Sequence, residues 1–131
     1  MTAASTPEGE KYGYVFKNCR LIHDERTAKV YLGRPWRPFA KTVFIDCELG
    51  DHILKEGWHN WNKKYAEKTT FYAEYGSKGP GAAPASDRVK WSHQLKAKET
   101  LQYTPSNVLK TEKEIDKHGN AVTVEWYFKV F

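Results

Sequence analysis

The sequence predicts an all-β protein, a partial parallel β-solenoid in which short strands of successive coils stack on one another. The main observation is an internal repeat: residues 15–21 (Val-Phe-Lys-Asn-Cys-Arg-Leu) match residues 43–49 (Val-Phe-Ile-Asp-Cys-Glu-Leu) after 28 residues. A weaker copy begins at Phe71, which lies 27 residues after Phe44. Periods of about 20–50 residues are typical of stacked repeats. Each copy is rich in β-branched and aromatic residues and is too short for a helix.

The composition is that of a soluble, folded domain with a modest basic excess, which is favoured to be a mixed solvated surface. The 131 residues are 40% apolar and 28% charged, which is enough for one domain with its own core. The net charge of +5 favours a polyanion, but no Lys/Arg run is dense enough to indicate nucleic-acid binding. No apolar run is long enough for a membrane helix. Residues 1–10 lack the basic and apolar segments of a signal peptide, so none is expected in this chain.

The second copy predicts a strand with two distinct faces, because its residues alternate. The expected inward residues are Val43, Ile45, Cys47 and Leu49, and the outward ones are Phe44, Asp46 and Glu48. In the first copy Lys17 interrupts the apolar row. Stacking would place Cys19 over Cys47 inside the solenoid. It would place Asn18 over Asp46 outside. The two thiols can be small buried side chains or a disulfide, and the first alternative is favoured.

Turn-rich segments separate the copies. Loops are expected at residues 34–38, 52–64 and 76–84, the last being rich in Gly and Pro. Residues 88–91 predict a short strand. Residues 95–103 predict one short helix that stops near Pro105.

The C-terminal residues predict a β-hairpin, with strands at 113–116 and 121–131 around a His-Gly-Asn turn. One face of its second strand holds Val122, Val124, Trp126, Phe128 and Val130. Such an apolar ribbon can cap the solenoid or pair with another chain. Self-association is therefore expected, through this strand or through an exposed coil end.

Residues 31–36, Tyr-Leu-Gly-Arg-Pro-Trp, form the most distinctive motif. Gly33 permits close approach of a neighbouring chain segment or a special turn. Arg34 carries a five-donor fork that suits a carboxylate, and Trp36 offers a flat face for stacking on a ring. Taken alone, the motif could also be an ordinary surface turn.

With this motif, the chain resembles the C-terminal part of the pectin methylesterases (pectinesterases), carbohydrate esterases built on a right-handed parallel β-helix. The matching motifs occur in order at residues 13–19, 31–36, 42–44, 56–58, 71–75, 79–82, 88–91 and 103–109. The resemblance covers about residues 2–109. We therefore expect one domain over residues 1–131, with pectinesterase-like coils to residue 109 and a hairpin or cap over 110–131.

The resemblance implies roles for three residues. In this family one aspartate attacks a galacturonate methyl ester, a second acts as general acid and base, and glutamines hold the oxyanion. Arg34 would orient the nucleophilic aspartate, while Trp36 and Trp58 would contact the sugar. The family's Gln-Asp-Thr and Asp-Phe-Ile-Phe-Gly motifs, which carry the aspartates, do not occur in these 131 residues. We therefore expect little or no esterase activity from the chain alone.

Two alternatives remain open: a non-catalytic module that binds polygalacturonate, or a fragment that requires an N-terminal half. The resemblance implies a pectin or oligogalacturonate partner, no membrane, no cofactor, and a secreted or periplasmic location for an intact family member. Asp46 is expected to be a solvated acid on the outer face. The five histidines are expected to be scattered surface residues, so no metal site is predicted.

Overall fold

The computed structural model describes residues 1–109, 113–115, 118–119 and 121–123. The chain forms two compact units, Met1–Thr100 and Leu101–Phe131. The first unit contains β1 (Thr2–Ala4), β2 (Tyr14–Lys17), β3 (Arg20–Leu21), β4 (Gly33–Pro35), β5 (Lys41–Ile45), β6 (Glu48–Leu49), the 3₁₀ helix η1 (Lys64–Lys68), β7 (Phe71–Tyr75), β8 (His93–Gln94) and α1 (Ala97–Thr100). The second contains α2 (Pro105–Val108), β9 (Lys113–Ile115) and β10 (Ala121–Thr123).

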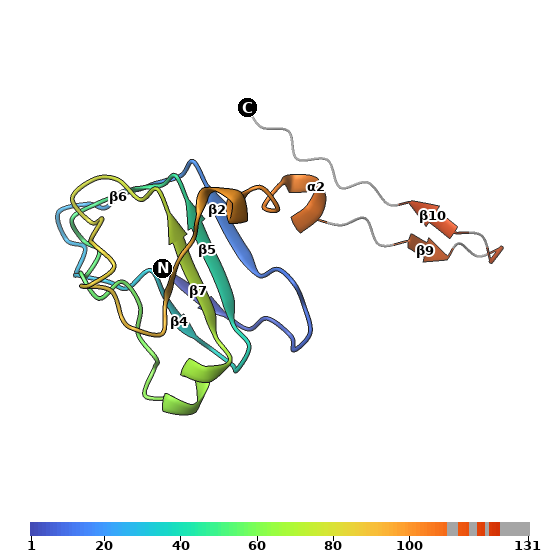
Figure 1. Ribbon diagram of the computed structural model, residues 1–131, viewed down its shortest axis with the longest axis horizontal. Helices are drawn as coiled ribbons and strands as arrows, with labels where there is room; N and C mark the ends of the chain where they lie inside the picture. Colours follow the sequence, from blue (N-terminus) through green and yellow to red (C-terminus); the bar gives the residue numbers. More distant parts are fainter. Residues whose placement is uncertain (110–112, 116–117, 120, 124–131) are drawn as a thin grey trace. The chain divides into compact units, whose positions relative to one another are not determined.

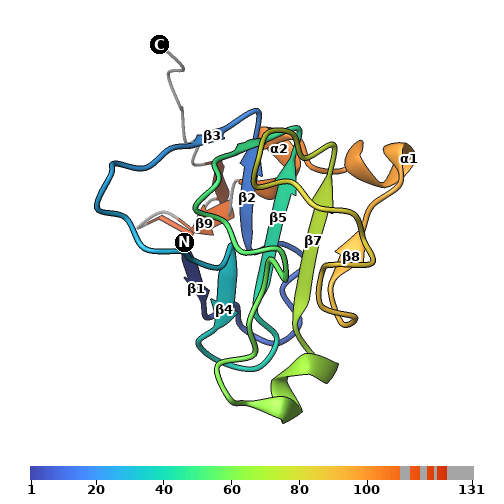
Figure 2. The ribbon, with the colours of Figure 1, turned by 90° about the vertical axis from the view of Figure 1, so that its left-hand side faces the viewer.

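The first unit is a parallel β-helix, as the sequence predicts. Its strands form three parallel sheets, in the orders β2-β5-β7-β8, β1-β4 and β3-β6. Strands β2, β5 and β7 lie side by side in both views of the ribbon (Figures 1 and 2). Phe16 pairs with Phe44 and Leu21 pairs with Leu49, so the predicted 28-residue register is confirmed for the first two coils.

The third copy was aligned wrongly from the sequence. The register pairs Lys41 with Phe71 and Phe44 with Glu74, which is an offset of 30 residues between these partners. Matching aromatic letters placed Phe71 opposite Phe44. The backbone hydrogen bonds of the parallel ladder determine the true register. In this register Glu74 is the neighbour of Phe44 on the side opposite Phe16.

Each of the three coils leaves the large sheet through a residue in the left-handed region. These residues are Asn18 (φ 55°), Asp46 (φ 51°) and Gly76 (φ 64°). Asn, Asp and Gly tolerate this conformation best. The stacking of Asn18 on Asp46 is thus confirmed at a corner of the coil, where the Asn18 N–H donates to the carbonyl of Ile45.

This corner also corrects the predicted faces of the second copy. Phe44, expected outside, is fully buried and stacks on Phe16 with ring centroids 4.6 Å apart. Cys47 belongs to the same buried cluster. The left-handed residue between them turns the chain, so strand alternation does not continue through it. Both cysteines are unbonded, and burial raises the pKa of the Cys47 thiol.

Several predicted segment types need correction. Residues 34 and 35 of the predicted loop belong to strand β4, and residues 53 and 58 of the next predicted loop form bridges to residues 30 and 33. Residues 88–91 form turns, and the last strand of the sheet is β8. The predicted helix shrinks to α1, and Pro105 begins α2 instead of ending a helix. There the Thr104 side chain accepts a hydrogen bond from the Asn107 N–H.

The predicted C-terminal hairpin is confirmed by the antiparallel pairing of β9 with β10. Of its predicted apolar face, Val124, Trp126, Phe128 and Val130 lie outside the described residues. Self-association through this ribbon or a coil end stays a prediction, as does the domain boundary at residue 109. Among the described residues, no helix is both long and apolar enough to cross a membrane.

The buried ion pair between Glu74 and Arg88 connects the third coil to the loops that contain residues 54–55 and residue 81. Glu74 in β7 and Arg88 have side chains only 2% and 1% exposed, with Arg88 Nε 2.8 Å from Glu74 Oε2. Arg88 Nη2 donates to Glu74 Oε1 and to the carbonyl of Gly81, and Nη1 donates to the carbonyls of Leu54 and Lys55. Every donor of the guanidinium is therefore used inside the protein.

We expect Glu74→Gln to lower the free energy of unfolding by about 3–5 kcal/mol, because it leaves the Arg88 charge buried without its counter-charge. Urea denaturation of the full chain measures the loss. The matched control is Glu48→Gln, which removes an exposed partner of Arg20 (Arg20 Nε–Glu48 Oε2, 3.0 Å) and should cost less than about 1 kcal/mol. Equal effects of the two substitutions would contradict the structural role of the buried pair.

Candidate functional site

Strand β4 presents its residues alternately to the interior and to solvent. Gly33 and Pro35 are buried and Arg34 between them is exposed. A Cβ on Gly33 would overlap the Thr2 hydroxyl and would lie 3.1 Å from the Trp58 ring. The predicted close approach at Gly33 is therefore confirmed, and it forces the next side chain, Arg34, outward.

The Arg34 guanidinium lies over the indole ring of Trp61, a residue outside the predicted site. Its Cζ is 4.4 Å from the centroid of the Trp61 ring, within the range of a cation–π contact. Among the described residues, no carboxylate forms an ion pair with Arg34. Its hydrogen-bond donors are thus available to an outside acceptor.

Trp36 and Lys63 complete this cluster. Trp36 is 51% exposed, and its ring meets that of Trp61 edge-on at 5.1 Å. Lys63 Nζ donates to the Trp36 carbonyl at 2.6 Å and lies 5.6 and 5.1 Å from the rings of Trp36 and Trp61. We call Arg34, Trp36, Trp61 and Lys63 the arginine–tryptophan face.

An unusual turn positions Trp61 beneath Arg34. Trp61 and Asn62 both have positive φ, 56° and 57°, which costs free energy for residues with side chains. The turn is supported from within: the Trp61 N–H donates to His59 Nδ1, and the Asn62 N–H donates to Asn60 Oδ1. Side chains of the same turn, His59 and Asn60, therefore stabilise the two positive φ angles that place the indole.

Trp58, predicted as a second sugar-contacting residue, lies in the core. It is 1% exposed and stacks on Tyr72 with ring centroids 4.4 Å apart. Trp58 forms a β-bridge with the buried residue Gly33, and it is buried like its partner. The next residue, His59, is partly exposed. The structure brings Arg34 and Trp36 together and keeps Trp58 apart from them. The partly buried indole of Trp61 lies beside Arg34 and Trp36 instead.

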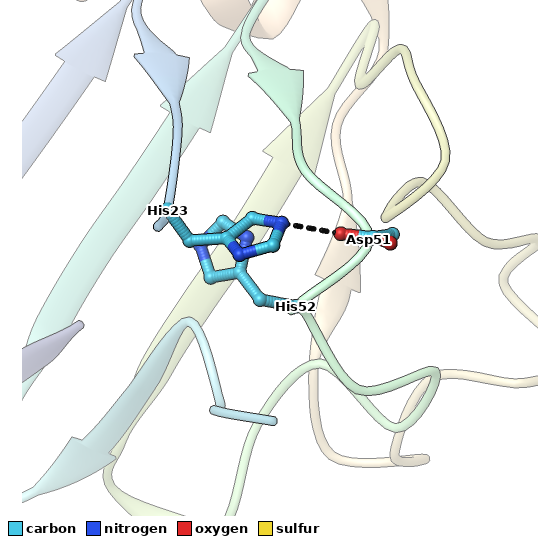
Figure 3. A group of neighbouring side chains, drawn as sticks. All are labelled: His23, Asp51 and His52. Carbon is cyan, nitrogen blue, oxygen red and sulfur yellow. Dashed lines mark hydrogen bonds and ion pairs between the residues drawn. The ribbon is translucent and has the colours of Figure 1, made fainter. Parts of the chain in front are cut away.

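A second cluster, at a different corner, joins His23, Asp51 and His52 (Figure 3). His23 Nε2 is 2.6 Å from Asp51 Oδ1, and the two imidazole rings lie 4.6 Å apart. The prediction of scattered surface histidines is wrong here, because His52 is only 3% exposed. The 28-residue repeat contained the signal, since it aligns His23 with Asp51.

Two opposite pKa shifts accompany this cluster. Hydrogen bonds to the Asp24 carbonyl and to the Asp51 carboxylate raise the pKa of His23. Burial, followed by the neighbouring His23 charge, lowers the pKa of His52. The Lys29 ammonium donates to the Asp51 carbonyl nearby. Asp46, by contrast, occupies its coil corner beside Gly76 and belongs to neither cluster.

The fold and the arginine–tryptophan face together define a parallel β-helix protein whose surface carries two cations beside one exposed and one partly buried indole. The pectinesterase family model matches residues 1–112, and the chain belongs to the pectinesterase family. It is 41% identical over 118 residues to a pectinesterase/pectinesterase inhibitor of Brassica campestris, and 37% identical over 123 residues to pectinesterase 4 of Arabidopsis thaliana. These matches cover 83% and 88% of this chain but only 20% and 21% of the relatives.

Solved structures agree with this assignment. The structure is similar to pectin methylesterase from carrot, with a TM-score of 0.69 and 27% identity over 80% of this chain and 35% of that one. It is also similar to pectin methylesterase PemA from Erwinia chrysanthemi, with a TM-score of 0.62 and 34% identity over 83% and 37% of the two chains. The chain thus spans about a third of these solved structures and about a fifth of the curated relatives.

Proposed function

We propose that this chain binds a galacturonate polymer through the arginine–tryptophan face and contributes that face to pectin methylesterase chemistry. The observation that carries the proposal is the placement of two cations, Arg34 and Lys63, against two indoles, Trp36 and Trp61. An acidic sugar offers a carboxylate to the cations and a ring face to the indoles.

The two cations would divide the work of binding. Arg34 presents unused donors above Trp61, so it can make a bidentate contact with a carboxylate. Lys63 is anchored to the Trp36 carbonyl and adds charge beside both rings. Family resemblance adds that Arg34 orients a nucleophilic aspartate, and an adjacent fixed cation would keep that aspartate ionised.

In this proposal the chain has little or no hydrolytic activity by itself. The two motifs that carry the family's aspartates are absent from the 131 residues, and residues that act as a catalytic unit lose most of their effect when one is missing. A non-catalytic polygalacturonate-binding module is the second candidate function, favoured by the exposed Trp36 ring. An in-frame Asp-Phe-Ile-Phe-Gly motif in genomic DNA upstream of Met1 would favour the esterase over the module.

The intact protein is proposed to act on extracellular pectin, as the resemblance implies, with the esterified polymer as substrate and the acidic polymer as product. The proposed partners include neither a membrane nor a nucleic acid. The arginine–tryptophan face holds two cations rather than a dense basic stripe, which agrees with a single acidic polysaccharide strand.

Oligogalacturonate binding tests the proposal directly. Calorimetry should show saturable binding that weakens about five- to tenfold in Trp36→Ala, which removes an exposed ring on which a sugar can stack. Trp61→Ala should weaken it similarly, because it removes the ring on which the Arg34 guanidinium rests. Arg34→Gln should weaken binding and its dependence on salt, since it removes an exposed charge. The matched control is Tyr14→Ala, which deletes another half-exposed aromatic residue and should leave affinity unchanged. No binding by any variant, the parent chain included, would overturn the proposal.

Methanol release from methyl-esterified pectin tests the catalytic part. We expect the purified chain to release methanol at a rate indistinguishable from buffer, while an intact pectinesterase assayed in parallel is active. The physical reason is the absence of a positioned carboxylate nucleophile. A rate comparable to that of the intact enzyme would show that another residue of this chain performs the attack.

A further inference from the structure

We propose that His23, Asp51 and His52 form a binding site for one divalent transition-metal ion of the Zn²⁺ type, which clamps the first two coils of the β-helix together. One ligand atom from each residue lies within 4.8 Å of the others. Figure 3 shows the two imidazoles lying against each other with the Asp51 carboxylate at their side.

The ligand set favours this class of ion. Two imidazole nitrogens and one carboxylate oxygen suit Zn²⁺ and its neighbours in the transition series. Ca²⁺ and Mg²⁺ demand six or more oxygen ligands, which a single carboxylate among two imidazoles does not supply. Three protein ligands leave one position open for water, as in zinc sites that are not purely structural.

The hydrogen bonds around His23 already match those of a metal ligand. Its Nδ1 lies 2.7 Å from the Asp24 carbonyl, and because a carbonyl only accepts, Nδ1 must carry a proton. Metal-binding histidines commonly donate one ring N–H to a backbone carbonyl and offer the other nitrogen to the ion. Here Nε2 points at Asp51 Oδ1, and the proton between these two atoms occupies the place that the ion would take.

His52 supplies an independent observation that points to a ligand. The side chain is buried, yet its Nδ1 has no hydrogen-bond partner among the described residues. A buried polar atom without a partner costs about 1–3 kcal/mol. Gly50 makes room for this ring, since a Cβ there would lie only 2.6 Å from His52 Nδ1. The fold thus tolerates an unpaired imidazole at the cluster.

Only a small movement converts the cluster into a coordination shell. Zn–N and Zn–O bonds of about 2.0–2.1 Å place tetrahedral ligands about 3.3 Å apart. The distance between His23 Nε2 and Asp51 Oδ1 must therefore lengthen from 2.6 Å, and the proton between these atoms is lost to solvent. Pairs of ligand atoms that lie farther apart than in the tetrahedral shell, within the 4.8 Å limit, must move closer together. The side chains of His23 and Asp51 are 30% and 62% exposed, so they can move around the fixed His52 ring.

The site lies on the wall of a hollow with a volume of about 270 Å³, which includes His23 and Asp51 among its lining residues. This hollow gives an ion and its water a route from solvent. Because His23 follows β3 and Asp51 follows β6, an ion held there would cross-link two coils that otherwise meet at this corner through two short strands. Binding to the folded state alone raises stability by mass action.

Calorimetric titration of the full, tag-free chain with Zn²⁺ tests the proposal. We expect one ion per chain and a rise in the urea midpoint on adding Zn²⁺. His23→Asn and Asp51→Asn should each weaken binding at least about tenfold and abolish that rise, as loss of a ligand does more than loss of a supporting hydrogen bond. Co²⁺ in place of Zn²⁺ should give visible absorption bands that the same substitutions remove.

Two control substitutions make the test specific. His93→Asn removes an exposed histidine that stacks on Phe71, and Asp24→Asn removes a neighbouring charge that provides no ligand atom. Both should retain Zn²⁺ affinity within about twofold. Absence of saturable Zn²⁺ binding, binding that survives His23→Asn and Asp51→Asn, or equal losses in Asp24→Asn and Asp51→Asn would each overturn the proposal. None of these outcomes depends on pectin binding.

Discussion

In-register stacking of successive coils is the constraint on which the rest of this structure depends. Once Phe16 lies on Phe44, the neighbouring pairs of these two strands follow in register. The same 28-residue offset places Arg20 beside Glu48 and Leu21 on Leu49. The left-handed residues at the corners maintain the register, since a Cβ on Gly76 would overlap the Asp46 carboxylate and only glycine fits under it.

Stacking also determines which side chains face solvent. In the sheet that contains β4, the column of Thr2, Gly33 and Trp58 faces inward, and the adjacent column exposes Arg34. The inward column contains the apolar ring of Trp58, whereas the outward column leaves the Arg34 cation exposed to solvent. The arginine–tryptophan face is a direct consequence of this alternation, completed by one strained turn that returns Trp61 to the surface.

The sequence predicted the parallel β-helix, the first register, the close approach at Gly33 and the exposed pair Arg34 and Trp36, because each rests on local spacing. It assigned the register of the third coil wrongly, because the segments between the strands differ in length from coil to coil. The sugar-contacting role of Trp58 came from the family resemblance, which did not indicate that this side chain is buried. Trp61 depends on two positive φ angles, which hydrogen bonds to the His59 and Asn60 side chains of the same turn stabilise. Positive φ is uncommon for a tryptophan, so the residue type alone did not indicate this turn.

The histidine cluster is a different case, since the register of the first two coils already aligned His23 with Asp51. Its third member, His52, is buried because the chain folds back at Gly50, and that close approach is visible only in three dimensions. Repeats in β-helices therefore carry information about side-chain pairs at the corners as well as about the strands.

Two arginines show how the same side chain is assigned to stability or to binding. Arg88 donates all five of its hydrogen bonds inside the protein, to Glu74 and to the carbonyls of Leu54, Lys55 and Gly81. Its donors therefore serve the third coil and are not available to a ligand. Arg34 rests on the Trp61 ring, with its Cζ 4.4 Å from the ring centroid, and this contact does not use its N–H groups. A cation held in this way loses less conformational entropy on meeting a carboxylate than a free one does. Arg34 is accordingly the arginine whose interaction energy remains available to a ligand.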